Sequence, residues 1–299
     1  MRKLFWLSLV GIGLGIALFF QLHPERNVST PSTIQQPVKP KLDIRYDSHR
    51  IQQSIVHTLF IPTDDNFVVI PTLSHQLTTL ETIAHKHQAI AAINGGFFDP
   101  NNQQSISYII QQGQLVADPR LNKRLMDNPK LAPYLPKILN RTEFRRYQCG
   151  EIFRYDIALH TEAIPAGCQL VDAIGGGPRL LPELTVSQEG FWEVVNGLVI
   201  RDPLSSCQPN ARSAIGITHD GNILWVMVAQ KQGGSHSSGM SLQELADFMK
   251  NQGVEKAMNL DGGSSSSFYY KDKTLYGKVD ENGNLVQRKV LSVLLVLRK

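Results

Sequence analysis

Residues 257–268 read AMNLDGGSSSSF, an apolar run that ends on one carboxylate and then passes into glycine and serine. The apolar half predicts a buried strand that delivers Asp261 into a polar loop. Glycines in such a loop allow a ligand to approach the backbone closely, and several N–H and O–H donors together suit a phosphate or an array of sugar hydroxyls. A flexible Gly/Ser linker is the alternative interpretation. Apolar sequence on both sides and a single acid at the strand end favour a functional site.

Three more stretches show a similar pattern. Residues 89–99 (AIAAINGGFFD) run from a predicted strand to Asn94 and Gly-Gly, followed by two aromatics suited to stacking on a sugar face. Residues 172–178 read DAIGGGP, and residues 211–216 (ARSAIG) bring Arg212 into a strand. The ordered motifs NGGFF, GGGP, RSAIG and NLDGGSS make the region from about residue 50 to residue 299 resemble the phosphodiester glycosidase family. Ser264 is a departure, because many members of that family carry a third glycine there.

The fold class follows from the order of the element signals. Strand and helix signals alternate early in the chain, and strands dominate its second half. This predicts an α+β fold with a mixed, largely antiparallel sheet core and flanking helices. With the resemblance, the expectation becomes a phosphodiester-glycosidase-like single domain over residues 50–299.

The resemblance implies cleavage of a sugar C1–O bond beside a phosphate. This reaction needs an acid or base near the anomeric carbon and control of charge on the leaving phosphate. We assign Asp261 to the anomeric centre or its water, Arg212 to bidentate binding of the phosphate, and Asn94 to a hydrogen bond with sugar or phosphate. Each residue has a structural alternative: Asp261 can cap its turn, Arg212 can be ion-paired at a strand end, and Asn94 can hold a left-handed turn.

Further candidates surround these three residues. The usual pair of glycosidase carboxylates requires a partner for Asp261, and sequence spacing does not select it. The glycines at 175–177 have a β-bulge as their alternative interpretation. The expected substrate-binding residues are Gly95, Gly96, Phe97, Phe98, Gly176, Gly177, Gly262, Gly263, Ser264 and Ser265, and the second-rank candidates are Asp99, Asp172, Asp202 and His236.

Other chemistries find less support in the sequence. The chain contains neither G-x-S-x-G nor G-x-x-x-x-G-K-[ST], so a nucleophile elbow and a P-loop are not expected. A metal-dependent phosphodiesterase and a non-catalytic glycan-binding module remain the alternatives. No cofactor is required by the sequence, and the need for a divalent metal stays open because oxygen-ligand sites have no signature spacing.

The N-terminus predicts attachment to a membrane. Arg2 and Lys3 precede nineteen residues without charge, 4–22, close to the ~20 needed to span a bilayer. The basic side should remain cytoplasmic, which places the rest of the chain on the extracytoplasmic side. Residues 1–23 are therefore an anchor or a signal segment, and the absence of a small-x-small site favours an uncleaved anchor. Residues 24–49 follow as a Pro/Ser/Thr-rich tether.

The net charge of the chain limits the kinds of partner that we expect. A net charge of +4 without any nucleic-acid-binding motif argues against nucleic acid, which leaves a glycosyl-phosphate substrate or an anionic glycopolymer and the membrane. Residues 120–146 contain eight Lys or Arg and are interrupted by prolines. They form either a solvated, partly helical excursion or a basic lip, including Arg141, Arg145 and Arg146, that attracts anionic polymer or lipid head groups.

Local signals predict several elements and one possible disulfide. Cys149 and Cys168 flank a predicted strand at 152–159 and could be bridged, although three cysteines allow three single bridges; that pairing would leave Cys207 over. The remaining expectations are strands at 54–61, 67–70, 191–200 and 289–297, a hairpin of 213–218 with 223–229, a helix from Ser74 to about His87, and a helix from the capping box at Ser241 to Gly253.

Overall fold

The computed structural model describes residues 43–63, 66–232 and 238–299. The predicted anchor, most of the predicted tether and His236 lie outside the described residues. Within the described ranges, no helix is both long and apolar enough to cross a bilayer. The first strand begins at Arg45, so the folded domain starts before the predicted boundary at residue 50.

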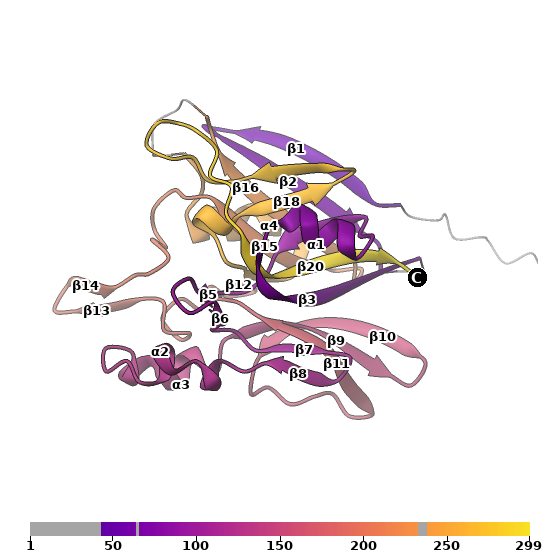
Figure 1. Ribbon diagram of the computed structural model, residues 1–299, viewed down its shortest axis with the longest axis horizontal. Coiled ribbons are helices and arrows are strands. Elements are labelled where there is room, and N and C mark those ends of the chain that lie inside the picture. The colour runs from indigo at the N-terminus through magenta and orange to yellow at the C-terminus, as the bar shows by residue number, and fades with distance from the viewer. Residues whose placement is uncertain (1–42, 64–65, 233–237) are drawn as a thin grey trace, which may run out of the picture. The chain divides into compact units, whose positions relative to one another are not determined.

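Six strands form the first sheet, in the spatial order β1-β2-β16-β15-β17-β12 (Figure 1). The β15–β16 connection is the predicted hairpin, in which Gly221 adopts a positive φ of 76°. Helix α4 covers one face of this sheet, and it opens with the predicted capping box of Ser241 and Glu244. The bounds are β1 Arg45–Ile51, β2 Ser54–Ile61, β12 Arg179–Leu181, β15 Arg212–Thr218, β16 Ile223–Gln230, β17 Val254–Asn259 and α4 Leu242–Asn251.

Five strands form the second sheet, in the order β19-β18-β4-β20-β3. The helix predicted from Ser74 is wrong in its first turn, because β3 continues to Thr78, where it pairs with Val290 of β20. The helix begins only after Thr79, whose hydroxyl caps it by accepting from the Thr82 N–H. The bounds are β3 Phe67–Thr78, α1 Leu80–Lys86, β4 Ala91–Asn94, β18 Ser267–Tyr270, β19 Lys273–Tyr276 and β20 Val290–Arg298.

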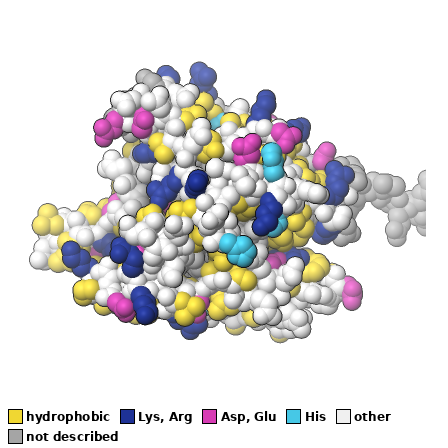
Figure 2. Space-filling model, viewed as in Figure 1, with side chains coloured by type: hydrophobic (Ala, Val, Ile, Leu, Met, Phe, Trp, Pro, Cys, Tyr) yellow, Lys and Arg dark blue, Asp and Glu magenta, His cyan; other side chains and the backbone are white. Residues whose placement is uncertain are grey.

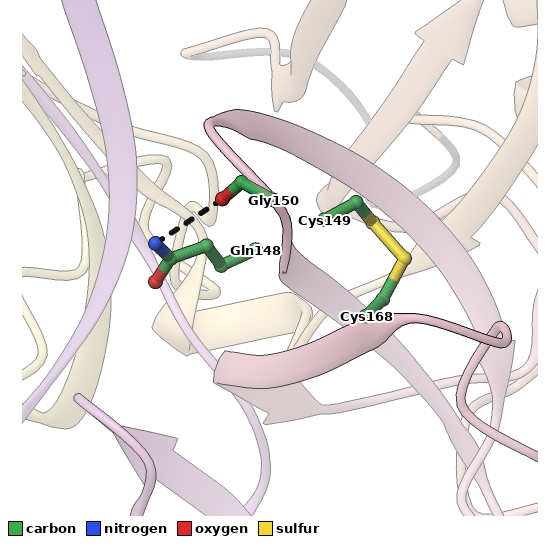
Figure 3. Close-up of a disulfide and its surroundings, with 4 residues drawn as sticks. All are labelled: Gln148, Cys149, Gly150 and Cys168. Carbon is green, nitrogen blue, oxygen red and sulfur yellow. Dashed lines mark hydrogen bonds between the residues drawn. A yellow bond between two sulfur atoms is a disulfide. The ribbon is translucent and has the colours of Figure 1, made fainter.

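Five strands form the third sheet, in the order β10-β9-β11-β7-β8. Cys149 of β9 lies directly opposite Cys168 of β11 and is disulfide-bonded to it (Figure 3), so the bridge suggested by the sequence is present. Cys207 is free and exposed. The bounds are β7 Ile109–Gln111, β8 Gln114–Ala117, β9 Thr142–Cys149, β10 Ile152–Leu159 and β11 Cys168–Gly175.

The three sheets share one hydrophobic core. Leu59 of the first sheet, Leu294 of the second and Ile174 of the third belong to the same buried cluster. Strand β16 is buried along its whole length and apolar up to Ala229, because Trp225 faces this core while Val226 faces α4. All the strand pairs among the described residues are antiparallel, so the predicted mixed pairing is wrong, whereas a largely antiparallel α+β fold with few helices is compatible with the structure.

One β-hairpin projects from the sheets. The single strand predicted over residues 191–200 is instead β13 (Glu193–Val195) and β14 (Leu198–Arg201), because Asn196 and Gly197 adopt positive φ angles and reverse the chain. Its apolar side chains are exposed, and Figure 2 shows hydrophobic side chains at the end of this projection.

The basic segment 120–146 is partly helical, as predicted, with α2 at Lys123–Met126 and α3 at Leu135–Ile138. The predicted basic lip of Arg141, Arg145 and Arg146 is wrong. Arg145 is buried with its Nε 2.9 Å from Glu143, and Arg146 is ion-paired with Asp172 at 2.6 Å. Arg141 is buried with its guanidinium 3.7 Å from the centre of the Phe191 ring. These charges hold the fold together instead of facing solvent.

Candidate active site

Asp261 stands where the first two sheets meet. Strand β17 ends at Asn259, and the chain then crosses between the sheets, with the Leu260 N–H donating to Ser213 O (2.8 Å) and the Asp261 N–H to Gly95 O (3.0 Å). A short 3₁₀ turn, η3 (Gly263–Ser265), follows. The predicted sequence of buried strand, acid and polar loop is therefore present, and the acid is fixed through its backbone.

The surroundings of Asp261 favour its protonated form. Burial raises the pKa of its carboxyl to about 6, against the Ser265 hydrogen bond, the Arg288 charge and the Gly262 N–H, which lower it. Part of the residue still reaches solvent. A carboxyl with a pKa of about 6 is suited to exchange a proton with substrate or water near neutral pH.

Arg288 is the cation beside this carboxyl, and sequence reasoning missed it. Its Nη1 donates to Ser264 Oγ at 3.1 Å, and its guanidinium lies 5.3 Å from the centre of the Phe98 ring. Arg288 is partly exposed, so its guanidinium is accessible to an anionic ligand. No local pattern identifies it, because it comes from a polar segment that follows the motif by more than twenty residues.

A second cation lies near the same loop. Lys278 Nζ donates to Asn210 Oδ1 at 3.1 Å, and burial together with the Arg212 charge lowers the pKa of Lys278. The neighbouring Gly277 N–H donates to Ser266 O at 2.8 Å, which attaches this segment to the serines after Asp261. The loop therefore has positive charge on two segments.

Arg212 does not have the predicted geometry of a phosphate clamp. It is only 2% exposed, and its Nε donates to Met240 O and its Nη1 to Leu204 O, both at 2.8 Å. Its Nη2 donates to Ser205 O and Gln208 O at 2.8 and 2.9 Å. Four of the five guanidinium N–H groups are thus engaged by carbonyls, so bidentate phosphate binding is not available. Burial lowers the pKa of Arg212 to about 10.

Asn94 positions Asp261 and cannot contact substrate. Its side chain is fully buried, and its Nδ2 donates to Asp261 O at 2.5 Å. Its Oδ1 accepts from Ser213 Oγ at 2.7 Å and from the Ser267 N–H at 3.2 Å. The predicted hydrogen bond to sugar or phosphate is therefore wrong. The amide instead ties β4 to β15, to β18 and to the Asp261 loop.

Four of the predicted ligand-binding glycines lie where neighbouring chain segments pack too closely for a side chain. A Cβ on Gly95 would lie 2.6 Å from Ser292 Oγ, and one on Gly96 would lie 2.2 Å from Gly175 O. A Cβ on Gly176 would lie 2.7 Å from Met258 Cε, and Gly177 has a φ of +97°. The N–H groups of these four glycines all donate to protein atoms, so they do not await a ligand. Gly262 and Gly263 are less tightly packed, since an added Cβ would lie 3.2 Å from Ala211 O at Gly262 and 3.9 Å from Asn210 Nδ2 at Gly263.

The two aromatics of NGGFF are also interior residues. Phe97 and Phe98 are each 8% exposed. Phe97 packs against Phe191 with ring centres 5.6 Å apart, and Phe98 lies beneath Arg288. The predicted stacking of these rings on a sugar is therefore wrong, and Phe98 instead supports the arginine.

The second-rank acids are each engaged in a local network. Asp99 pairs with Arg124 at 2.9 Å, and Asp202 accepts from the Ser206 N–H and hydroxyl. Asp172 pairs with Arg146 in the third sheet. These three acids are thus occupied by structural partners. Among the described residues, no three His, Cys, Asp or Glu side chains gather in an arrangement that could hold a metal ion.

The geometry places one acid with a raised pKa beside an arginine where the antiparallel sheets meet, an arrangement compatible with a hydrolase. The family model for phosphodiester glycosidases matches residues 87–297. The chain therefore belongs to the phosphodiester glycosidase family and is a glycosidase, a hydrolase acting on sugar phosphodiesters. The resemblance found in the four motifs is confirmed.

Two solved structures share the fold. The catalytic domain of zebrafish N-acetylglucosamine-1-phosphodiester alpha-N-acetylglucosaminidase, auto-inhibited by its pro-peptide, is 18% identical with a TM-score of 0.61, covering 86% of this chain and 83% of that one. A hypothetical protein from Synechocystis is 18% identical with a TM-score of 0.56, covering 86% of this chain and 62% of that one. A comparison with curated protein sequences gave no match. At these identities the structural likeness establishes the fold alone.

Proposed function

We propose that the protein cleaves the sugar C1–O bond of a glycosyl-1-phosphodiester in a cell-envelope or extracellular glycopolymer. The main supporting observation is that Asp261, an acid with a pKa of about 6, lies near the Arg288 guanidinium, which lowers that pKa by its charge and donates to Ser264 in the loop after Asp261. The family supports the reaction class. The name of the zebrafish enzyme describes removal of a sugar from a phosphodiester, which supports cleavage of the sugar C1–O bond.

The chemistry divides between the two residues. A phosphate leaves more readily than an alkoxide, so strong protonation of the leaving oxygen is less necessary. Asp261, with its pKa near 6, accepts the proton of the attacking water in its ionised form. Arg288 stabilises the negative charge that grows on the departing phosphate, and Ser264 orients the guanidinium. Arg288 thereby replaces Arg212 in the role that the sequence suggested.

The cellular side is part of this proposal. Residues 4–22 are long and apolar enough for an anchor, with basic residues before them. The Cys149–Cys168 disulfide supports an oxidising compartment, which suits an extracytoplasmic domain. We infer that the enzyme is held at the membrane with its domain outside the cytoplasm.

The test is hydrolysis in ¹⁸O-water. The full-length chain in detergent is incubated with a panel of glycosyl-1-phosphodiesters as wild type, Asp261→Asn and the control Asp272→Asn, whose side chain is 87% exposed. We expect label in the anomeric hydroxyl of the released sugar from wild type and control but not from Asp261→Asn. Label in the phosphate would assign the protein to the phosphodiesterases. Binding of the panel without turnover would leave a glycan-binding module.

A further inference from the structure

One cavity in the described part of the chain is not lined by Asp261. It has a volume of about 500 Å³ and lies between strands β3 and β20 of the second sheet, β7 and β8 of the third, and the hairpin of β5 (Phe98–Asp99) and β6 (Gln104–Ser105), all seen in Figure 1. This volume is within the ~300–1,000 Å³ typical of small-molecule sites. The catalytic assignments above leave this cavity without a role.

The walls suit an uncharged, hydroxyl-rich ligand. Four side-chain amides line the cavity, from Gln103, Gln104, Gln111 and Asn122, and no Lys or Arg does. The carboxylate of Asp118 is already bound by two guanidinium nitrogens of Arg120, at 2.9 and 2.6 Å. Amides both donate and accept, so they match sugar hydroxyls, whereas an anionic ligand would find no cation on these walls.

Apolar side chains complete the lining. Leu121 is 75% exposed and Val116 is 39% exposed, and both border the cavity. Exposed aliphatic groups beside amides provide a surface for the C–H face of a sugar ring, while the amides take its hydroxyls. This combination favours a saccharide over a purely polar ligand.

One buried donor on the wall lacks an acceptor. Asn122 is 1% exposed, and its Oδ1 accepts from the Leu125 N–H at 3.3 Å and from Asn102 Nδ2 at 2.8 Å. These two donors fix the orientation of the amide, because a flipped amide would oppose N–H to N–H. Its Nδ2 has no hydrogen-bond partner in the described structure. Buried donors are seldom left unpaired, and an oxygen atom of a ligand in the cavity would supply the missing acceptor.

The cavity adjoins the frame of the active site. Leu291 lines it, and the next residue, Ser292, accepts from the N–H groups of Gly95 and Gly96. The Gly95 carbonyl in turn accepts from the Asp261 N–H. The cavity wall is therefore connected to the Asp261 loop through the hydrogen bonds of Ser292 and Gly95.

We propose that this cavity is a binding subsite for a neutral saccharide unit of the substrate, with Asn122 Nδ2 donating to a sugar oxygen and Leu121 packing against the ring. The proposal deepens the proposed function and rests on it, because it takes the substrate to be a glycan that extends beyond the cleaved bond.

Calorimetric titration of the full-length chain in detergent tests the subsite. The probes are maltotetraose, cellotetraose, chitotetraose and mannotetraose. Asn122→Asp keeps an oxygen that caps α2 but replaces the donor by a second oxygen, so we expect about tenfold weaker binding. Because the new carboxylate is buried, the variant should also be less stable, and its binding is measured well below its Tm. Leu121→Ala should weaken binding similarly. Leu198→Ala, a change of equally exposed leucine (71%) on the projecting hairpin, should leave affinity unchanged.

Three results would overturn the subsite. They are the absence of tetraose binding by the wild type, wild-type affinity in both the Asn122 and Leu121 variants, and binding of phosphorylated glycans only. Wild-type turnover of a short glycosyl-1-phosphodiester, measured in parallel, separates the two proposals. Turnover without tetraose binding would refute the subsite alone, and tetraose binding without turnover would refute the hydrolase.

Discussion

We expect Arg288→Gln to reduce turnover at nearly unchanged stability, and Arg212→Gln to lower stability. The two arginines have the same charge and lie near the same loop, but their guanidinium groups have different partners. Arg288 is partly exposed and donates to one serine hydroxyl, whereas Arg212 is buried and donates to four backbone carbonyls. The two substitutions therefore distinguish an arginine that binds the substrate phosphate from an arginine that stabilises the fold around the site.

The expected effect of Arg288→Gln follows from one charged contact. A hydrogen bond to a charged group contributes about 1.5–3 kcal/mol, which corresponds to a roughly 10- to 150-fold loss in kcat/KM. The Arg288 charge also lowers the pKa of Asp261, so its removal should raise that pKa further. The acidic limb of the kcat/KM profile should then move to higher pH. A change of a partly exposed side chain should alter the free energy of unfolding by less than about 1 kcal/mol.

The expected effect of Arg212→Gln follows from four lost or weakened bonds. Glutamine has at most two N–H donors, so buried carbonyls of the 204–208 segment and Met240 lose their partners. Breaking such a buried network lowers the free energy of unfolding by about 3–5 kcal/mol, a large part of the ~5–15 kcal/mol of a typical domain. A fall in Tm of roughly 10 °C should result.

Thermal unfolding and steady-state kinetics on the same preparations test both expectations. Activity of Arg212→Gln is measured well below its Tm, so that loss of folded protein does not imitate loss of catalysis. The reasoning would be refuted if Arg288→Gln kept the wild-type kcat/KM and pH profile. It would also be refuted if Arg212→Gln unfolded at the wild-type Tm but failed to bind the phosphodiester, because Arg212 would then be the clamp.

Three other substitutions have definite expected outcomes. The pKa of Asp261 is about 6 in the folded protein, above its value in the unfolded chain, so the contribution of this shift to the free energy of unfolding is present below pH ~4 and is lost as pH rises through 6. The loss is at most roughly 3 kcal/mol. The free energy of unfolding of Asp261→Asn, measured at a series of pH values, should not show this decrease. Asn94→Ala removes three buried hydrogen bonds and should lower the free energy of unfolding by about 3 kcal/mol. It should also reduce kcat more than substrate affinity. An unchanged kcat would show that the Asp261 backbone does not need the Asn94 hydrogen bond. Gly96→Ala places a Cβ 2.2 Å from Gly175 O and should lower the free energy of unfolding, measured by chemical denaturation, by more than about 2 kcal/mol. The control Gly113→Ala has open space around the new Cβ and only a positive φ, so it should lower the free energy of unfolding by about 1 kcal/mol.

Elements with complete local signals could be predicted from the sequence. The capping box at Ser241 and the Asp-Gly turn at Gly221 involve neighbouring residues only, and both are present. The end of β3 could not be predicted, because Leu73 and Thr78, on either side of Ser74, pair with distant β20. The β13–β14 hairpin is a different kind of error, since Asn196 and Gly197 are a local turn signal that was overlooked within a valine-rich run.

The candidate site was predictable in part for the same reason. Asp261 follows a strand and precedes glycine, so its position at a loop could be read locally. Arg288 reaches the loop from another segment, and its partners Ser264 and Phe98 lie far from it in the sequence. Burial also decides which of the two arginines can bind the phosphate. The burial of a single side chain depends on tertiary packing, and a local motif does not show it.

The motifs themselves describe a frame more than a binding surface. NGGFF, GGGP and NLDGG converge where backbones of the sheets pass so closely that a Cβ at Gly95, Gly96 or Gly176 would overlap another chain segment. Such close packing requires glycine whatever the ligand is, and it holds Asp261 through its own backbone. Residues that select a substrate face fewer constraints of this kind and can come from segments outside the motifs, as Arg288 and Asn122 do. A motif of this type therefore locates a site and its acid, and the residues that select phosphate and sugar have to be found from burial and unpaired donors.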